Sequence, residues 1–288
     1  MNAGGQQAAE ELGIEWLYQA RRRPTPPLRP TSCVRSSSRA STRSSSPPND
    51  PDSMAPLLQE AKDAGIAVAT SDTDAPPDSV RQVFVNQASV EGIGIALTEA
   101  LMDAMGGKGK YAIVSCGETA ANLNAWIEVQ KAHTAEAFPP DAEIVDVVFA
   151  GEDQAAATAM ATDLMNAHPP DLTGLVGECT SSAPGVAQAV RDAGKIGQVF
   201  TVGLGTPQSM KPYLEDGSSS ASILWDVEAL GFLTAWAGLQ LAEGNEFQAT
   251  NRVSDALPPA VEYDATTNVL LLGDPLRITV DNAGDFDY

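Results

Sequence analysis

The feature that most constrains this chain is the regular alternation of short apolar runs with longer segments of helical periodicity. The apolar runs predict strands at 66–69, 81–85, 111–115, 142–149, 172–176, 199–204 and 220–224. The segments after or before them predict helices at 54–64, 90–105, 122–135, 153–167, 183–193, 209–214 and 227–241. Successive βα units form parallel sheets covered by helices on both faces, so the predicted fold class is α/β with doubly wound parallel sheets.

Composition narrows the classes of function. The 288 residues carry a net charge of -21, and 43% of them are hydrophobic, which is typical of a globular protein with an acidic surface. Nucleic acid is not expected as a partner, because phosphate binding requires clustered Lys and Arg. No apolar run approaches the ~20 residues of a membrane span, and the first residues show no basic, apolar secretory leader.

Two acids follow the predicted strand at 66–69. Asp72 and Asp74 stand in Ser-Asp-Thr-Asp-Ala-Pro, directly after the strand. In open α/β sheets, ligands bind beyond the carboxyl ends of the strands, so both carboxylates are candidates for holding a polar ligand. The alternative is that Asp72 caps a turn and Asp74 is solvated.

The cysteines and histidines predict no catalytic or metal centre and no cofactor. Cys33, Cys116 and Cys179 lack metal-ligand spacing, and His133 and His168 lie far apart in the sequence. One disulfide could be drawn, but nothing in the sequence requires it. Because Cys116 and Cys179 each end a predicted strand, we expect them to be buried near the mouth of a sheet.

Residues 21–48 differ in composition from the rest of the chain. Arg, Ser and Pro dominate this tract, and it contains no Asp or Glu. Such a segment buries too little apolar surface to offset chain entropy, so we expect it to be disordered. It could be a natural linker, a basic tail, or a stretch of gene translated in the wrong frame. The third interpretation is favoured, because the tract stands where the βα rhythm requires a helix and a strand.

Several short motifs follow one another along the chain. They are Ser71-Asp72-Thr73-Asp74, Val85-Asn86-Gln87, Thr206-Pro207, Met210-Lys211-Pro212-Tyr213, Leu224-Trp225-Asp226-Val227 and Asp285-Phe286-Asp287-Tyr288. In this order they resemble the periplasmic sugar-binding proteins of ABC importers, and within them the branch that binds rhamnose or autoinducer-2. Each motif alone is weak, but the shared order over residues 2–18 and 49–288 is specific.

The resemblance implies two α/β lobes that close on a small sugar. The corresponding divisions are a lobe 1 fragment at 1–20, the tract at 21–48, lobe 1 at 49–87 and lobe 2 at 88–224. Residues 225–288 would cross back, supply a lobe 1 helix and form a C-terminal interlobe segment. The resemblance further implies a monomer, an extracytoplasmic location, a membrane permease as partner and no enzymatic activity. We expect the first lobe to be incomplete and sugar binding by this chain to be weak or absent.

The resemblance also assigns roles to residues. Asp72 corresponds to the family's ligand-gripping carboxylate, with Asp74 beside it. Trp225 could cover the apolar face of a sugar, and Asp226 could accept hydrogen bonds from its hydroxyls. The pair Asn86–Gln87 corresponds to a crossing between lobes, where hinge motion is expected.

Three further residues are implied to line the cleft: Asn122, Glu178 and Thr180. Here the sequence departs from the autoinducer-2 branch. An Asp-Gln pair in that branch corresponds to Asn122 and Leu123, and a Pro and an Ala correspond to Glu178 and Thr180. These departures argue against autoinducer-2 and favour rhamnose or another sugar.

Two other classes of protein remain alternatives. The triplet Asp72-Thr73-Asp74 matches the Asp-x-Asp signature of metal-dependent glycosyltransferases, in which carboxylates hold a divalent ion. The effector domain of a sugar-responsive repressor would share the two-lobed fold. A repressor would need a helix-turn-helix before the first lobe, and neither residues 1–20 nor the basic tract supplies one.

Overall fold

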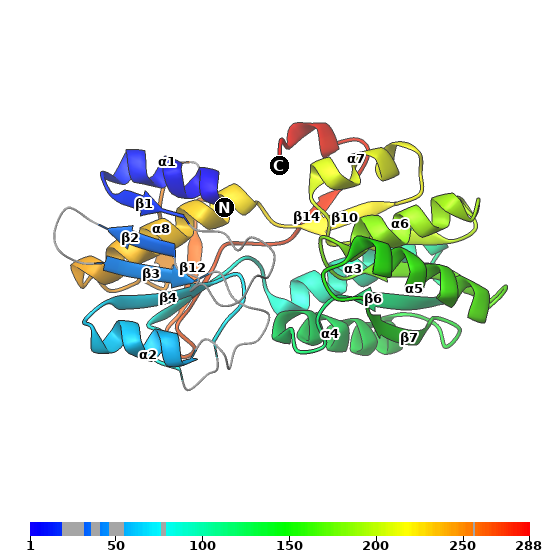
Figure 1. Cartoon of the computed structure of the whole chain (residues 1–288), viewed down its shortest axis with the longest axis horizontal. Coiled ribbons are helices and arrows are strands. Elements are labelled where there is room, and N and C mark those ends of the chain that lie inside the picture. The colour runs from blue at the N-terminus through cyan, green and yellow to red at the C-terminus, as the bar shows by residue number, and fades with distance from the viewer. Residues whose placement is uncertain (19–31, 36–40, 46–54, 76–78, 256) are drawn as a thin grey trace. The chain divides into compact units, whose positions relative to one another are not determined.

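The computed structural model describes residues 1–18, 32–35, 41–45, 55–75, 79–255 and 257–288. The chain forms two compact units (Figure 1). Unit 1 contains Met1–Ser89 and Trp225–Asp274, and unit 2 contains Val90–Leu224 and Pro275–Tyr288. The polypeptide therefore passes from one unit to the other three times. Each unit has a mixed α/β fold built on its own sheet, and this confirms the predicted fold class.

Unit 1 is built on a sheet of eight strands in the order β1-β2-β3-β4-β5-β13-β12-β11. The central strands β3, β4, β5 and β13 are parallel, whereas the strands toward both edges pair antiparallel. The strands are β1 (Glu15–Leu17), β2 (Ser32–Arg35), β3 (Ser41–Ser45), β4 (Ala67–Ser71), β5 (Val83–Asn86), β11 (Thr250–Asn251), β12 (Val261–Asp264) and β13 (Val269–Leu271).

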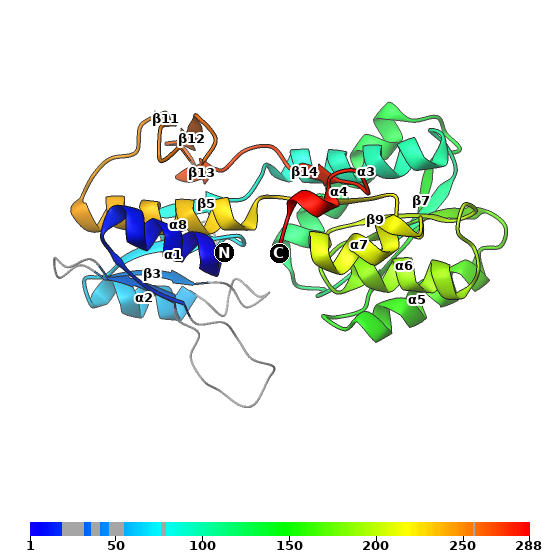
Figure 2. The same ribbon diagram turned by 90° about the horizontal axis from the view of Figure 1, so that it is seen from above.

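Helices cover both faces of this sheet. Helices α1 (Asn2–Leu12) and α8 (Val227–Glu243) lie on one face and α2 (Ala55–Asp63) lies on the other, as Figure 2 shows. Neighbouring residues of β4 point to opposite faces, so Ala69 joins the core under α8 while Val68 packs with Leu58 and Ala61 of α2. Strand β4, which ends directly before Asp72, is thus buried on both faces.

Helices α1 and α8 approach each other closely through glycine. A Cβ atom added at Gly4 would lie 1.7 Å from the backbone oxygen of Glu228, closer than any real contact. The absence of side chains at this position lets the two backbones touch, and α1 is thereby held against the start of α8.

We expect Gly4→Ala to destabilise unit 1 by about 1–3 kcal/mol, because the added methyl group must push α1 away from α8. Urea denaturation of the two proteins measures the difference. Gly273→Ala is the matched control, since a Cβ there would meet only Pro258 at 3.9 Å. Equal stability of both variants would show that α1 does not pack as described.

Unit 2 is built on a sheet of six strands in the order β14-β10-β9-β8-β6-β7. All pairs are parallel except β10 with β14 at the edge. The strands are β6 (Lys110–Ser115), β7 (Glu143–Phe149), β8 (Leu172–Gly177), β9 (Phe200–Gly203), β10 (Ala221–Leu224) and β14 (Leu276–Ile278).

Helices again lie on both faces of the sheet. They are α3 (Val90–Met105), α4 (Ala121–Ala137), α5 (Gln154–Ala167), α6 (Ser182–Asp192) and α7 (Pro207–Glu215), followed near the C-terminus by the 3₁₀ helix η2 (Ala283–Asp285). Helices α3 and α4 cover one face, and α5 and α6 cover the other (Figure 2). The core under α5 and α6 includes Ala112, Val114 and Leu175. None of the helices in the described ranges combines the length and apolar character needed to cross a membrane.

The structure differs from expectation in the basic tract. Strands β2 and β3 lie within residues 21–48, which the composition predicts to be disordered. Strand pairing uses backbone groups that every non-proline residue supplies, so a Ser- and Arg-rich segment can pair where a neighbouring strand is available. Here β3 pairs with β4, with Thr42 opposite Ala67. The rest of the tract, 21–31, 36–40 and 46–48, lies outside the described residues.

Candidate functional site

Asp72 occupies an unusual backbone conformation at the carboxyl end of β4. Its φ is 70°, in the left-handed region that few residues other than glycine adopt. The backbone N–H of Thr73 donates to the Ser71 carbonyl (2.9 Å) and that of Asp72 to the Val85 carbonyl (3.2 Å), which together form a tight turn against β5. Backbone strain of this kind is concentrated at ligand sites.

Burial raises the pKa of the Asp72 carboxyl to about 6, opposed by the nearby Met1 amino group. The residue is half-buried, but its carboxyl is well removed from solvent. A hydrogen bond to α8 holds the residue before the turn, because the hydroxyl groups of Ser71 and Thr234 lie 2.8 Å apart. Asp72 is thus a carboxyl group presented by a tight backbone turn.

Asp74 has a different environment, although it is only two residues away. One of its oxygens accepts hydrogen bonds from the Thr70 hydroxyl (2.7 Å) and the Ala75 N–H (2.9 Å). The other forms an ion pair of 2.6 Å with Arg81. Because both oxygens are engaged within the loop, Asp74 stabilises the turn that presents Asp72. The Asp-x-Asp triplet does not offer two open carboxylates to one metal ion.

Asp226 lies at the start of α8. One of its carboxylate oxygens accepts hydrogen bonds from the backbone N–H groups of Glu228 and Ala229, which makes Asp226 the N-cap of the helix. Burial lowers the pKa of the Met1 amino group, and the charges of Glu228, Asp226 and Asp72 oppose this change. Trp225 is partly buried against the core under α8.

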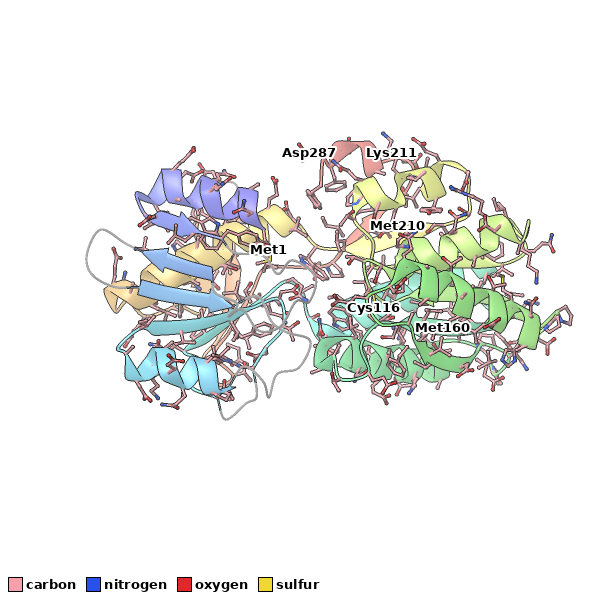
Figure 3. The ribbon with its side chains drawn as sticks, viewed as in Figure 1. Met1, Cys116, Met160, Met210, Lys211 and Asp287 are labelled. Atoms are coloured by element: carbon pink, nitrogen blue, oxygen red, sulfur yellow. A yellow bond between two sulfur atoms is a disulfide. The ribbon has the colours of Figure 1, made fainter. Side chains whose placement is uncertain are left out.

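In unit 2, a disulfide joins the carboxyl ends of two neighbouring strands. Cys116 follows β6 and Cys179 lies two residues after β8, and their sulfur atoms are bonded. Figure 3 marks Cys116 at the end of its strand. The Ser181 hydroxyl lies 3.1 Å from the Cys179 sulfur. Both cysteines lie near the mouth of the sheet, and their pairing fixes the loops after β6 and β8 to each other.

Asn122 and Thr180 lie in these two loop regions. Asn122 is half-buried in the first turn of α4, and Thr180 is exposed between β8 and α6. Both follow the carboxyl ends of adjacent strands in unit 2, where the sequence places them. That they contact a ligand stays a prediction.

Glu178 has a different environment from Asn122 and Thr180. It is completely buried, and both of its carboxyl oxygens lie 2.9 Å from the Nε2 atom of Gln130 on α4. Burial raises the pKa of Glu178 to about 8, and the hydrogen bond from Gln130 only partly opposes this. The residue lies in the core between β8 and α4 rather than on an open surface.

The predicted hinge residues come just before a passage between units. Asn86 ends β5, and unit 2 begins at Val90. The Gln87 side chain is buried, and its Oε1 atom has no hydrogen-bond partner. Their role in hinge motion stays a prediction.

A cavity of about 540 Å³ lies in unit 1 beside the amino ends of β4 and β5, whereas Asp72 follows the carboxyl end of β4. It is separate from the turn at Asp72. Its lining residues are Lys62, Gly65, Ile66, Ala67, Ser79, Val80, Arg81, Gln82 and Leu241. In the part of the chain that the structure describes, no three His, Cys, Asp or Glu side chains gather as metal ligands.

Comparison with known proteins finds similarity to binding proteins of ABC transporters, in sequence and in structure. A sequence profile described as "Periplasmic binding protein domain" matches residues 47–246. A sugar ABC transporter protein from Actinomyces odontolyticus has a TM-score of 0.70 and is 32% identical, with 83% of this chain and 76% of that chain covered. An ABC transporter solute-binding protein from Clostridium phytofermentas with bound L-rhamnose has a TM-score of 0.73 and 28% identity, covering 81% and 75%.

Two further relatives bind other ligands. The LsrB protein from Clostridium saccharobutylicum, in complex with AI-2, has a TM-score of 0.73 and 26% identity, covering 83% of this chain and 80% of that one. The D-ribose/D-allose-binding protein of Pseudomonas aeruginosa is 28% identical over 176 residues, which are 59% of this chain and 53% of the relative. The match thus spans about half the length of this curated relative.

Proposed function

The chain belongs to the periplasmic binding protein family, and from that premise we propose that it is the substrate-binding component of an ABC importer for a small sugar. Proteins similar to it bind L-rhamnose, AI-2 and D-ribose or D-allose, and they are binding proteins rather than enzymes. The proposal includes a membrane permease as partner, an extracytoplasmic location and a monomeric state.

The observation that carries the proposal is the pair of acids in unit 1, Asp72 after the carboxyl end of β4 and Asp226 at the start of α8. Asp72 stands in a tight turn with no ion pair of its own among the described residues, and the charges of both Asp72 and Asp226 act on the Met1 amino group. Sugar hydroxyls donate well to carboxylates, because a hydrogen bond to a charged acceptor is about twice as strong as a neutral one. Trp225 beside Asp226 offers an aromatic surface for the apolar side of a ring.

The ligand contacts that we propose are Asp72, Asp226 and Trp225 within unit 1 and, separately, Asn122 and Thr180 within unit 2. Asp74 is left out because Arg81 engages it, and Glu178 is left out because it is buried against Gln130. The hinge is assigned to Asn86 and Gln87.

Rhamnose is the proposed sugar. The solute-binding protein with bound L-rhamnose is among the most similar structures, and Asn122 and Thr180 depart from the pattern of the autoinducer-2 branch. Whether this chain binds sugar depends on how well unit 1 holds the turn at Asp72. Strand β4, which ends at this turn, is paired on one side with β3 and on the other with β5. We therefore expect measurable sugar binding by this chain, in place of the weak or absent binding that an incomplete lobe would give.

Titration calorimetry of the purified chain tests the function. L-rhamnose, D-ribose, D-allose and AI-2 are each added with and without a metal chelator. The expected result is saturable binding of at least one of them, with L-rhamnose the tightest. Because ligand contacts come from side chains and not from a metal, the chelator should have no effect.

A parallel titration with a nucleotide sugar, with and without Mn²⁺ or Mg²⁺, separates the alternatives. Binding of a nucleotide sugar that requires Mn²⁺ or Mg²⁺, with no binding of a free sugar, would support the glycosyltransferase alternative and overturn the proposal. Tight binding of AI-2 without rhamnose binding would keep the importer function and change the proposed ligand.

A further inference from the structure

The buried carboxyl of Glu178 is not explained by sugar binding. Its side chain is inaccessible, and its backbone N–H donates to the Val114 carbonyl across the sheet (3.0 Å). Among the described ion pairs, none includes Glu178. An ionised carboxylate in this position would be a buried charge with no opposite charge paired to it, which is strongly unfavourable.

One buried oxygen atom beside Glu178 lacks a donor. Val114 pairs with Gly177, so Ser115 and Glu178 are the next residues on neighbouring parallel strands and lie on the same face. The Ser115 Oγ atom and the Gln130 Oε1 atom are both buried without a hydrogen-bond partner. The Ser115 hydroxyl carries a hydrogen of its own, whereas Gln130 Oε1 can only accept. A proton on Glu178 would supply a donor for that amide oxygen, and a carboxylate would add only acceptors.

The network next to Glu178 is already complete. The Thr134 hydroxyl donates to the Gln130 carbonyl (2.7 Å), so the Tyr111 hydroxyl must donate to the Thr134 oxygen, 2.7 Å away. Neither hydroxyl hydrogen is left for Glu178. Tyr111 itself remains neutral because burial raises its pKa to about 12.

We propose that Glu178 is a neutral carboxylic acid in the folded protein and that its acid–amide pair with Gln130 is a pH-sensitive lock between β8 and α4. The lock holds the loop that follows β8, in which Cys179 is tied to Cys116. Losing the proton leaves a buried charge, which can be relieved only by admitting water between the strand and the helix. This proposal does not depend on sugar binding.

Several ionisable groups on the surrounding elements have partners of their own. Tyr111 is bonded to Thr134, and the disulfide cysteines do not titrate. The ionisable groups on α3, α4 and β6 that need to be considered are Glu91, Glu99 with His133, Asp103 with Arg277, Glu128 with Lys131, Glu136, and Lys110 with Glu143 and Asp171. A comparison of variants at constant pH cancels their contributions.

The expected pH dependence has a definite sign. Folded Glu178 keeps its proton up to about pH 8, whereas in the unfolded chain it loses the proton near its ordinary value of 4.5. Between these values the unfolded state binds fewer protons, so the stability of unit 2 falls as pH rises and levels off above about pH 8.

The test compares the full chain with Glu178→Gln, which is neutral at every pH and has nearly the same shape. The probe is 5-fluorotryptophan, with Trp126 on α4 reporting on unit 2 during urea unfolding. The urea midpoint of the wild type should fall relative to that of Glu178→Gln as pH rises from 5 to 8. Glu128→Gln, on the exposed side of α4, should keep the wild-type pH dependence.

A constant difference between wild type and Glu178→Gln across this pH range would overturn the proposal. If Glu178→Gln does not fold, ¹³C NMR of the wild type labelled at glutamate carboxyl carbons gives an independent readout. One glutamate should titrate near pH 8, and Gln130→Met should move that midpoint upward, since the Gln130 hydrogen bond favours the charged form. Titration of every glutamate carboxyl below pH 6 would equally contradict a neutral Glu178.

Discussion

Replacing Cys116 and Cys179 together with serine is expected to lower the free energy of unfolding of unit 2 by roughly 4 kcal/mol. The two cysteines are 63 positions apart, so their bond removes much of the conformational freedom of the unfolded segment between β6 and the loop after β8. The stabilisation by a disulfide increases with the length of the segment that it closes. The ¹⁹F signal of fluorinated Trp126 during urea denaturation measures the change in unit 2.

Two controls isolate the bond from the substitution. Cys33→Ser leaves the disulfide in place and should keep the unit 2 midpoint of the wild type. A thiol reductant should destabilise wild-type unit 2 to the level of the double variant and leave the double variant unchanged. A double variant as stable as the wild type would show that the two sulfur atoms are not bonded in solution.

Asp72→Asn should weaken sugar binding by roughly 10- to 100-fold, equivalent to about 1.5–3 kcal/mol for the loss of hydrogen bonds to a charged group. The amide has the shape of the carboxylate but not its charge, and the turn at φ 70° also suits asparagine. Calorimetry of both proteins with the sugar that binds best gives the ratio. Asp63→Asn, an exposed acid of α2, is the control and should bind like the wild type.

The Asp72 effect should also depend on pH. The pKa of Asp72 is raised to about 6, so the carboxyl is ionised above that pH and protonated below it. Sugar affinity of the wild type should therefore rise as pH increases through 6, and that of Asp72→Asn should stay flat. Equal affinities of the two proteins at pH 7.5 would remove Asp72 from the proposed ligand set.

The sequence predicts the parallel part of the fold well because strands that are buried on both faces leave continuous apolar runs. The run at 172–176 corresponds to β8 and the run at 220–224 to β10, each within a residue or two. The short strands β11, β12 and β13 were not predicted. Val269–Leu271 is an apolar run, but three residues are too few to separate a strand from a buried loop.

For the candidate site, the sequence identifies the loop after β4 but not the different environments of the two acids in it. Asp72 and Asp74 look alike in sequence, and they differ because Arg81 pairs with Asp74. The basic residue seven positions later was visible, but which acid it reaches depends on the path of the turn. Likewise, Cys116 and Cys179 can bond because β6 and β8 are neighbours, and strand order is not encoded in local sequence.

The environment of Glu178 also cannot be predicted from its position in the sequence. Its position after a parallel strand favours a place at the edge of the sheet, where ligands bind. The alternation of side chains along β8 turns it instead toward α4, where Gln130 is available as a partner. Nothing in a single sequence links a glutamate on one element with a glutamine 48 positions earlier.

The three passages between units set an order in which this protein can be assembled during synthesis. Strand β5 pairs on one side with β13, so that side stays open until the chain has been made as far as Leu271. Helix α8, which covers one face of the same sheet, also follows all of β6 to β10. Unit 2 can form nearly all of its sheet while unit 1 still lacks its later strands and its covering helix. Unit 1 therefore spends the longest time with unpaired strand edges, and it is the part of the nascent chain most in need of protection from aggregation.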